Sequence, residues 1–169
     1  MPAVNQPKGS VSTGSIKPVT RKAVRCQREV AWLVTQAAGK LVATTDDVNA
    51  PTPSFVLAAA LSYSREQEQT AQDNGRTIDY KAVMGPDLDN FCQAAGLPTA
   101  PNALSNAGYM FTLSGANLIR DLYAYCSDLG ERMGDTVQVK PGYAIKLVLR
   151  LFLLDGASAA TASDGKTSA

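Results

Sequence analysis

The residues best suited to phosphate chemistry form a short run near the end of the sequence. Ala160, Gly165, Lys166 and Thr167 fit the loose pattern of a phosphate-binding loop. Such a loop needs a strand before it and a helix after it, because the first amides of that helix hold the phosphates. Only two residues follow Thr167, so we do not expect nucleotide binding at this motif.

A second pattern resembles the start of a calcium-binding loop. Asp87, Asp89 and Asn90 have suitable spacing, but Phe91 occupies the third ligand position and Pro98 stands where a bidentate Glu is needed. Carboxylates in the first turn of a helix also complement the helix dipole. We therefore interpret these residues as a helix start and predict no metal site.

Histidine is absent from the sequence. This excludes Ser-His-Asp and Cys-His catalysis and every zinc site that needs imidazole. Cys26, Cys92 and Cys126 form no CxxC pair, so we expect buried small hydrophobes in a reducing compartment, with an intermolecular disulfide as the alternative. No Ser, Thr, Lys or Cys lies in a recognisable nucleophile motif. We expect a protein that is not an enzyme and has no cofactor, metal or small-molecule substrate.

Basic residues are concentrated near the N-terminus. Residues 1–30 contain six Lys and Arg side chains against the single acid Glu29, whereas the net charge of the whole chain is only +1. The candidate contact residues for nucleic acid or for a neighbouring subunit are Lys17, Arg21, Lys22, Arg25 and Arg28. If they belong to a helix, Arg21, Arg25 and Arg28 share one side of it.

The partner of this basic set is open between two classes. It can contact phosphates of a nucleic-acid backbone, or the mildly acidic remainder of another copy of the chain. No helix-turn-helix, zinc-finger or RNP motif is present, and no aromatic residues alternate with the basic ones. Any nucleic-acid binding is therefore expected to be independent of sequence.

The chain divides into a body and two polar arms. Residues 1–18 and 156–169 are rich in small and polar residues and cannot bury enough apolar surface to order on their own. Residues 19–155 are expected to form a compact, mainly α domain of four or five helices. We find no signal peptide and no apolar stretch long enough to span a bilayer, so we expect a virion or cytoplasmic location.

Hydrophobic periodicity and capping residues predict the helices of the body. A first helix starts after Thr20 and runs to about Val42, and a second extends from Thr52-Pro53 to Asn74-Gly75. The polar second half of that helix either projects into solvent or contacts another subunit. A short helix has Pro86 as its first residue and ends at Gly96, and a longer one runs from Ser114 to Gly134.

The last element can be read as a helix or as a strand. Every odd position from Tyr143 to Leu153 is apolar, as in a strand, but Lys146 and Arg150 also fit one helix face. Leucine content and length favour a helix, and a short β element near residues 137–153 is the alternative.

These features favour a structural subunit of a large assembly, such as a virus or phage coat protein or a filament subunit. The plan of arm, helical body and arm resembles the organisation of many viral coat subunits. Arms without structure of their own can order on neighbouring copies and so link subunits together. The alternative is a small helical adaptor or a nucleic-acid-associated accessory protein, without a membrane partner.

Overall fold

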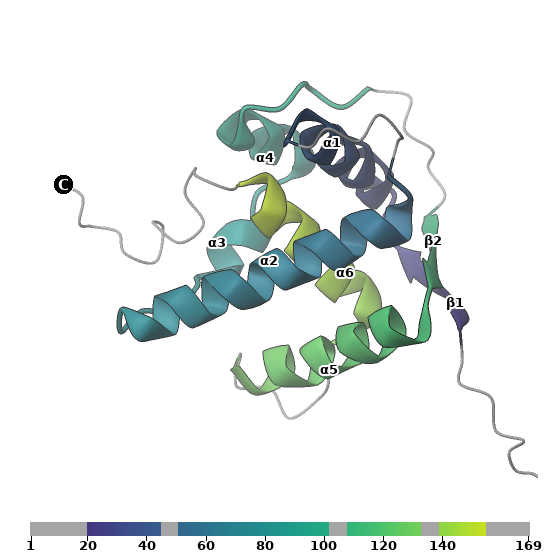
Figure 1. The fold of residues 1–169 in the computed structure, drawn as a ribbon. Coiled ribbons are helices and arrows are strands. Elements are labelled where there is room, and N and C mark those ends of the chain that lie inside the picture. The colour runs from purple at the N-terminus through teal and green to yellow at the C-terminus, as the bar shows by residue number, and fades with distance from the viewer. Residues whose placement is uncertain (1–19, 45–50, 102–107, 133–138, 155–169) are drawn as a thin grey trace, which may run out of the picture.

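The computed structural model describes residues 20–44, 51–101, 108–132 and 139–154, and within these ranges the chain is mostly helical (Figure 1). The predicted mainly α fold class is confirmed. The predicted arms, 1–18 and 156–169, lie outside the described residues. In chain order the elements are β1 (Arg21–Cys26), α1 (Glu29–Thr44), α2 (Pro53–Asp73), α3 (Tyr80–Met84), α4 (Leu88–Ala95), β2 (Tyr109–Ser114), α5 (Ala116–Arg132) and α6 (Pro141–Leu153).

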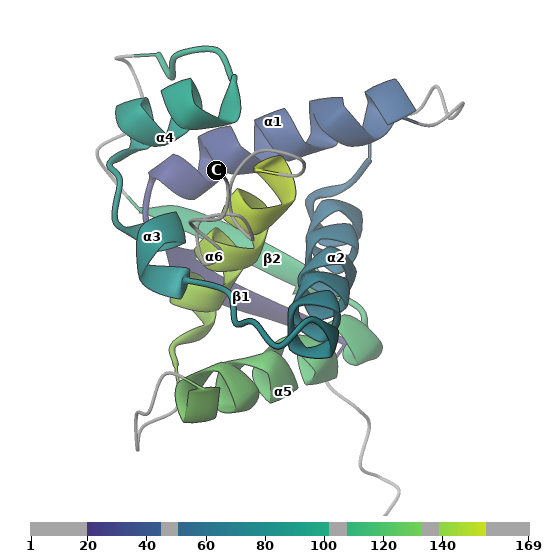
Figure 2. The same ribbon diagram turned by 90° about the vertical axis from the view of Figure 1, so that its left-hand side faces the viewer.

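Helix α6 lies at the centre of the fold, in contact with α1, α2, α3, α5 and β1 (Figures 1 and 2). Nine of its residues are buried, namely every residue from Ala144 to Leu153 except Lys146. A helix that is apolar on nearly every side belongs in a core. The strand-like alternation in this segment therefore arises because both odd and even positions are buried, and the helix interpretation is confirmed.

The N-terminal part of the predicted first helix is wrong. Residues Arg21–Cys26 form strand β1, and α1 begins only at Glu29, so Thr20 is not its N-cap. The strand forms because β1 pairs along its whole length with β2, from Arg21 opposite Ser114 to Cys26 opposite Tyr109. This partner is distant in sequence, and its pairing outweighs the local helical spacing. The hydrophobic periodicity that predicts α1 corresponds to one apolar side of the helix, on which Val30, Leu33, Val34 and Ala37 are buried and Ala38 and Leu41 are partly buried.

The two-stranded antiparallel sheet covers one side of the core. Val24 and Cys26 of β1 and Phe111 and Leu113 of β2 are buried on its inner face. The opposite face carries exposed side chains from both strands, which are Arg21, Ala23, Arg25, Met110, Thr112 and Ser114. Among the described residues, one face of the sheet is therefore covered by the core and the other face is exposed.

Helix α2 has the predicted limits. The Thr52 side chain accepts a hydrogen bond from the Phe55 amide, Pro53 is the first helical residue, and Asn74 is the C-cap. The polar second half of α2 is not fully surrounded by solvent, because Glu68 is buried there against Tyr80 and Arg132 of the same chain.

The other two predicted helices have corrected starting points. In α4, Asp87 is the N-cap and accepts a hydrogen bond from the Asn90 amide, so Pro86 precedes the helix and is not its first residue. Gly96 ends α4 with a φ of +71°, as expected of a glycine C-cap. Ser114 is the last residue of β2 and is not part of α5, which begins at Ala116. The predicted end of α5 at Gly134 lies outside the described residues.

The remaining short β element is not found where the structure can test it. Val139 and Lys140 do not form a strand, and residues 137–138 lie outside the described ranges. Two elements that the sequence did not predict are α3 and β2. The alternation of apolar and polar residues in β2 is short, and this strand pairs with β1, which is distant in the sequence.

The three cysteines are buried and unpaired, as predicted. Burial raises the pKa of Cys26 and of Cys126 to about 11, and it also raises the pKa of Cys92. Thiolates are the reactive form of cysteine, so these residues are packing groups rather than nucleophiles.

The stripe of α5 provides a test of the core. Leu122 has no exposed surface, and we expect Leu122→Ala to lower the free energy of unfolding by about 2–5 kcal/mol because it leaves a cavity. Leu118→Ala, at a partly buried position of the same helix, is the matched control and should have a smaller effect. Chemical denaturation measures both, and a change below about 0.5 kcal/mol in Leu122→Ala would contradict its core position.

Candidate functional site

The basic residues near the N-terminus are presented by a strand. Arg21 and Arg25 share the outward face of β1, because positions four apart point the same way in a strand as well as in a helix. Lys22 points to the opposite face, where its Nζ lies 5.7 Å from the ring centroid of Tyr123 in α5. Arg28 follows the strand, so the predicted single face of Arg21, Arg25 and Arg28 is wrong. Lys17 lies outside the described residues.

One edge of this sheet is closed by α2. The Ser54 hydroxyl near the start of α2 donates to the Thr112 carbonyl and accepts from the Ser114 amide. These backbone groups of β2 point away from β1, and the serine side chain occupies the position that another strand would take. The β2 edge is therefore capped at its C-terminal end.

The β1 edge has an open segment. The Gly115 amide donates to the Thr20 carbonyl, so Thr20 and Gly115 form a hydrogen-bonded pair of the ladder. Hydrogen-bonded and non-hydrogen-bonded pairs alternate along an antiparallel ladder. Arg21 and Ala23 belong to non-hydrogen-bonded pairs, so their backbone N–H and C=O groups point away from β2. Both residues are exposed, and within the described ranges no backbone hydrogen bond reaches this side of them. Further along, Gly142 of α6 packs against the Arg25 carbonyl and covers the end of the edge.

The start of α6 brings further cations beside β1. A cavity of about 310 Å³ lies between the end of β1 and the first turn of α6. Three basic residues line it together with one aromatic and four other residues, namely Arg25, Lys140, Lys146, Tyr143, Cys26, Gln27, Met84 and Gly142. Arg25 and Lys140 are exposed, and neither forms an ion pair with another described residue.

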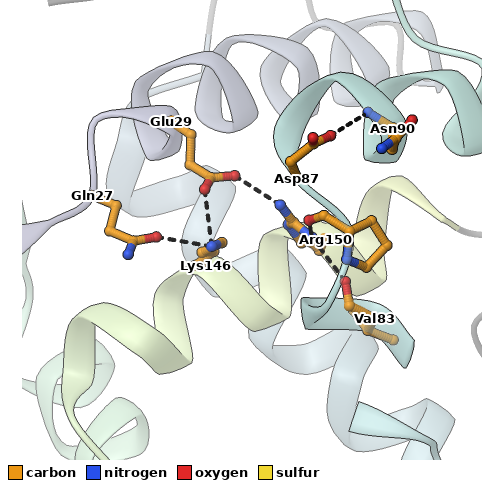
Figure 3. Close-up of polar contacts among 8 residues, drawn as sticks. Gln27, Glu29, Val83, Asp87, Asn90, Lys146 and Arg150 are labelled. Atoms are coloured by element: carbon orange, nitrogen blue, oxygen red, sulfur yellow. Dashed lines mark hydrogen bonds and ion pairs between the residues drawn. The ribbon is translucent and has the colours of Figure 1, made fainter. Parts of the chain in front are cut away.

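Lys146 is held in place by residues that follow β1. Its Nζ lies 2.9 Å from Glu29 Oε1 and donates to Gln27 Oε1 at 2.8 Å (Figure 3). The other carboxylate oxygen of Glu29 accepts from Arg150 at 2.9 Å. Burial raises the pKa of Glu29, but the hydrogen bonds and charges of Lys146 and Arg150 outweigh burial and hold it below its ordinary value.

Arg150 is a structural cation rather than a ligand-binding one. Its side chain has no exposed surface. Its guanidinium lies 4.6 Å from the ring centroid of Phe91. It donates to the Val83 carbonyl at 3.0 Å and to the Pro86 carbonyl at 2.8 Å. Together with the ion pair to Glu29, these hydrogen bonds join α6 to α1, to α3 and to the residues before α4 (Figure 3).

A second buried polar cluster joins α2, α3 and α5. The Tyr80 hydroxyl donates to Glu68 Oε2 at 2.6 Å, and Arg132 forms an ion pair with the same carboxylate. Burial, followed by the charge and hydrogen bond of Glu68, raises the pKa of Tyr80 well above its usual range. Both partners of the Glu68 carboxylate thus belong to the same chain, which is the arrangement of a structural ion pair.

The described residues contain no cluster of side chains that could hold a metal ion. No group of three or more Cys, Asp or Glu lies close enough to hold a metal ion in these ranges. Asp87 and Asp89 occupy the start of α4, as predicted. The larger depression, about 530 Å³ between α2 and α5, is lined mainly by small and apolar residues with Arg65 and Asp121. The loose phosphate-loop match at 160–167 lies outside the described part of the chain.

Comparison with protein-family models, with curated proteins and with solved structures finds no match for this chain. None of the described helices is both long enough and apolar enough to cross a membrane. A function can therefore be inferred only from the geometry of two features. One is the cavity lined by Arg25, Lys140 and Lys146, which we call the cationic cavity, and the other is the open segment of β1.

Sequence reasoning missed half of this site. Lys140, Tyr143 and Lys146 are far from Arg25 along the chain, and the sequence predicts only that they lie in the last element or just before it. No local pattern relates them to the basic N-terminal residues. The i, i+4 spacing of Lys146 and Arg150 was the one available signal, since two charges on an otherwise apolar helix require a buried partner.

The shared carboxylate makes a testable contribution to stability. We expect Glu29→Gln to lower the free energy of unfolding at neutral pH by about 3–5 kcal/mol, because it removes the anionic partner of a buried cation. Glu66→Gln, at an exposed position of α2, is the control and should change stability by less than about 0.5 kcal/mol.

The same pair predicts a pH dependence. The pKa of Glu29 is lower in the folded chain than the ordinary 4.5, so the stabilisation is present above that value and is lost as pH falls through the folded pKa. Denaturation curves of wild type and Glu29→Gln should converge as the pH decreases below 4.5. A difference that stays constant with pH would contradict the ionic role of Glu29.

Proposed function

We propose that this protein is a non-enzymatic structural subunit that associates with copies of itself in a large assembly, such as a virion coat or a filament. The observation that carries the proposal is the open segment of β1, at Arg21 and Ala23, in a sheet of only two described strands. Unpaired strand edges are templates for another chain. Proteins that remain monomeric usually cover or block such edges.

The geometry favours growth of the sheet on one side. Ser54 caps the C-terminal end of β2, whereas the outward backbone groups of Arg21 and Ala23 are available for pairing. A strand from a neighbouring copy that pairs there makes a heterologous contact unless it is the neighbour's own β1. Strand addition supplies main-chain hydrogen bonds without requiring a particular sequence.

The composition supports the same proposal. A net charge of +1 gives little electrostatic repulsion between copies. The segment 1–18 leads directly toward β1 in the sequence, and 156–169 follows α6, so the predicted arms would emerge from the sheet and the core helix. For a subunit of such an assembly we propose a virion or cytoplasmic location.

A second function is favoured by the cationic cavity. Arg25, Lys140 and Lys146 in one cavity would also suit a small accessory protein that binds a nucleic-acid backbone without self-association. The alternative of a helical adaptor shares this basic surface. The two functions differ in their oligomeric state.

Size-exclusion chromatography with light scattering separates them, with absorbance read at 260 and 280 nm. We expect a species far larger than the 17.8 kDa chain. A single peak at the monomer mass at all concentrations would overturn the structural-subunit proposal and favour the accessory protein. Excess absorbance at 260 nm would show that nucleic acid is bound.

The β1 edge can be blocked without disturbing the sheet itself. The Ala23 amide points outward, so Ala23→Pro removes no hydrogen bond to β2 but blocks an added strand. We expect self-association to weaken about tenfold or more, because a main-chain bond is lost and the ring obstructs pairing. Ala23→Val keeps the amide and should associate as the wild type does. Equal association of both variants would contradict pairing through this edge.

Deletion of residues 1–18 tests the arm. We expect the deleted chain to retain its helical circular dichroism and its cooperative thermal unfolding, since the described core begins after this segment. Light scattering should show weaker assembly than for the full chain. Loss of folding on deletion would contradict the interpretation of this segment as an assembly arm.

A further inference from the structure

We infer that the cavity between β1 and α6 binds the backbone of single-stranded nucleic acid, with phosphates on Arg25 and Lys140 and a base stacked on Tyr143. The inference deepens the proposed function and rests on it, because a subunit that encloses nucleic acid supplies this ligand. The juxtaposition that carries it is an aromatic ring and three cations lining one cavity of about 310 Å³.

The charges at the cavity are not balanced. Lys146 is paired with Glu29, and the same carboxylate is shared with Arg150, so one anion serves two cations. Arg25 and Lys140 add two more positive charges, both exposed at the surface and without an ion-pair partner among the described residues. An anionic ligand that reaches the cavity therefore meets an excess of positive charge, which is the electrostatic requirement for phosphate binding.

The fold determines the backbone positions of Arg25 and Lys140. Arg25 belongs to the paired part of β1 opposite Met110. Its carbonyl packs against Gly142, where an added Cβ would lie only 2.6 Å from the carbonyl oxygen. This close approach of α6 to β1 brings Lys140 next to Arg25.

The aromatic residue favours single strands over duplexes and over acidic peptides. Tyr143 is only partly buried and lines the cavity with Met84, so an apolar surface lies beside the cations. Sequence-independent proteins that bind single strands combine a positive groove with aromatic rings on which bases stack. A duplex keeps its bases stacked internally, and an acidic peptide has no general need for a stacking surface.

This arrangement changes the interpretation of the basic sequence. No aromatic residue alternates with the basic residues in residues 17–28, which weakened the case for nucleic acid. The fold supplies the aromatic group from α6 instead. Sequence-independent stacking and charge contacts also agree with the lack of any base-reading motif in the sequence.

Fluorescence anisotropy of a labelled 20-nucleotide oligouridylate, titrated with the full chain between about 50 and 200 mM salt, tests the inference. Arg25→Ala and Lys140→Ala should each reduce the slope of log affinity against log salt by about 0.7, and together should weaken binding roughly ten- to a hundredfold at low salt. Arg120→Ala, an exposed cation of α5 whose side chain is 71% exposed, is the charge-matched control and should leave affinity and slope unchanged. Thermal unfolding shows that each variant is folded.

Tyr143→Leu separates stacking from charge. It should weaken binding about five- to a hundredfold and leave the salt slope unchanged, because losing a stacked base releases no counterions. Tyr143→Phe keeps the ring and should bind as the wild type does. A labelled 20-nucleotide oligothymidylate shows whether the 2′-hydroxyl contributes, since equal affinity for both probes places recognition on phosphate and base alone.

Four results would overturn the site. They are no binding of the oligouridylate at low salt, an equal loss in Arg120→Ala, an unchanged affinity in Tyr143→Leu, and tighter binding of poly-glutamate than of the oligouridylate by the wild type. The last result would assign the cavity to acidic protein segments. If the chain assembles but the site variants bind normally, the proposed function stands and this inference fails. If the chain stays monomeric but the site variants lose binding, the inference stands and the accessory function replaces the structural one.

Discussion

The buried guanidinium of Arg150 and its carboxylate partner Glu29 constrain the arrangement of the whole domain. A charge without exposed surface is tolerated only if its donors find partners. Arg150 satisfies this requirement at its two terminal nitrogens, Nη1 with the Val83 and Pro86 carbonyls and Nη2 with Glu29, although its Nε has no hydrogen-bond partner. The apolar residues of α6 supply most of the burial, and these directed contacts determine how α1 and the α3–α4 segment lie around it.

The candidate site follows from the same constraint. Glu29 uses its second oxygen for Lys146, one turn before Arg150 on α6. This contact fixes the first turn of α6 beside the end of β1, where Tyr143 and Lys140 reach the cavity that Arg25 also lines. The backbone of the proposed binding cavity is thus positioned by core contacts.

Local chemistry determined which elements could be predicted from the sequence. Thr52, Asn74 and Gly96 terminate helices through bonds and backbone conformations that belong to those residues, and these boundaries are confirmed. The stripes of α1 and α5 were recognisable because each helix has one apolar side. Strand β1 was not, since its conformation depends on β2, more than eighty residues away, and a basic run with spacings of three and four also fits a helix. The candidate site was half predicted for the same reason, because Arg25 belongs to the basic N-terminal run whereas Lys140 joins it only through tertiary packing.

The central position of α6 has a consequence for biosynthesis. The helix against which α1 and α2 pack is the last described element of the chain, so a nascent polypeptide lacks its core until residues 141–153 have left the ribosome. Folding that must wait for long-range contacts is slower than folding through local ones. The cavity that Arg25 and residues of α6 line together therefore forms only after α6 has been synthesised.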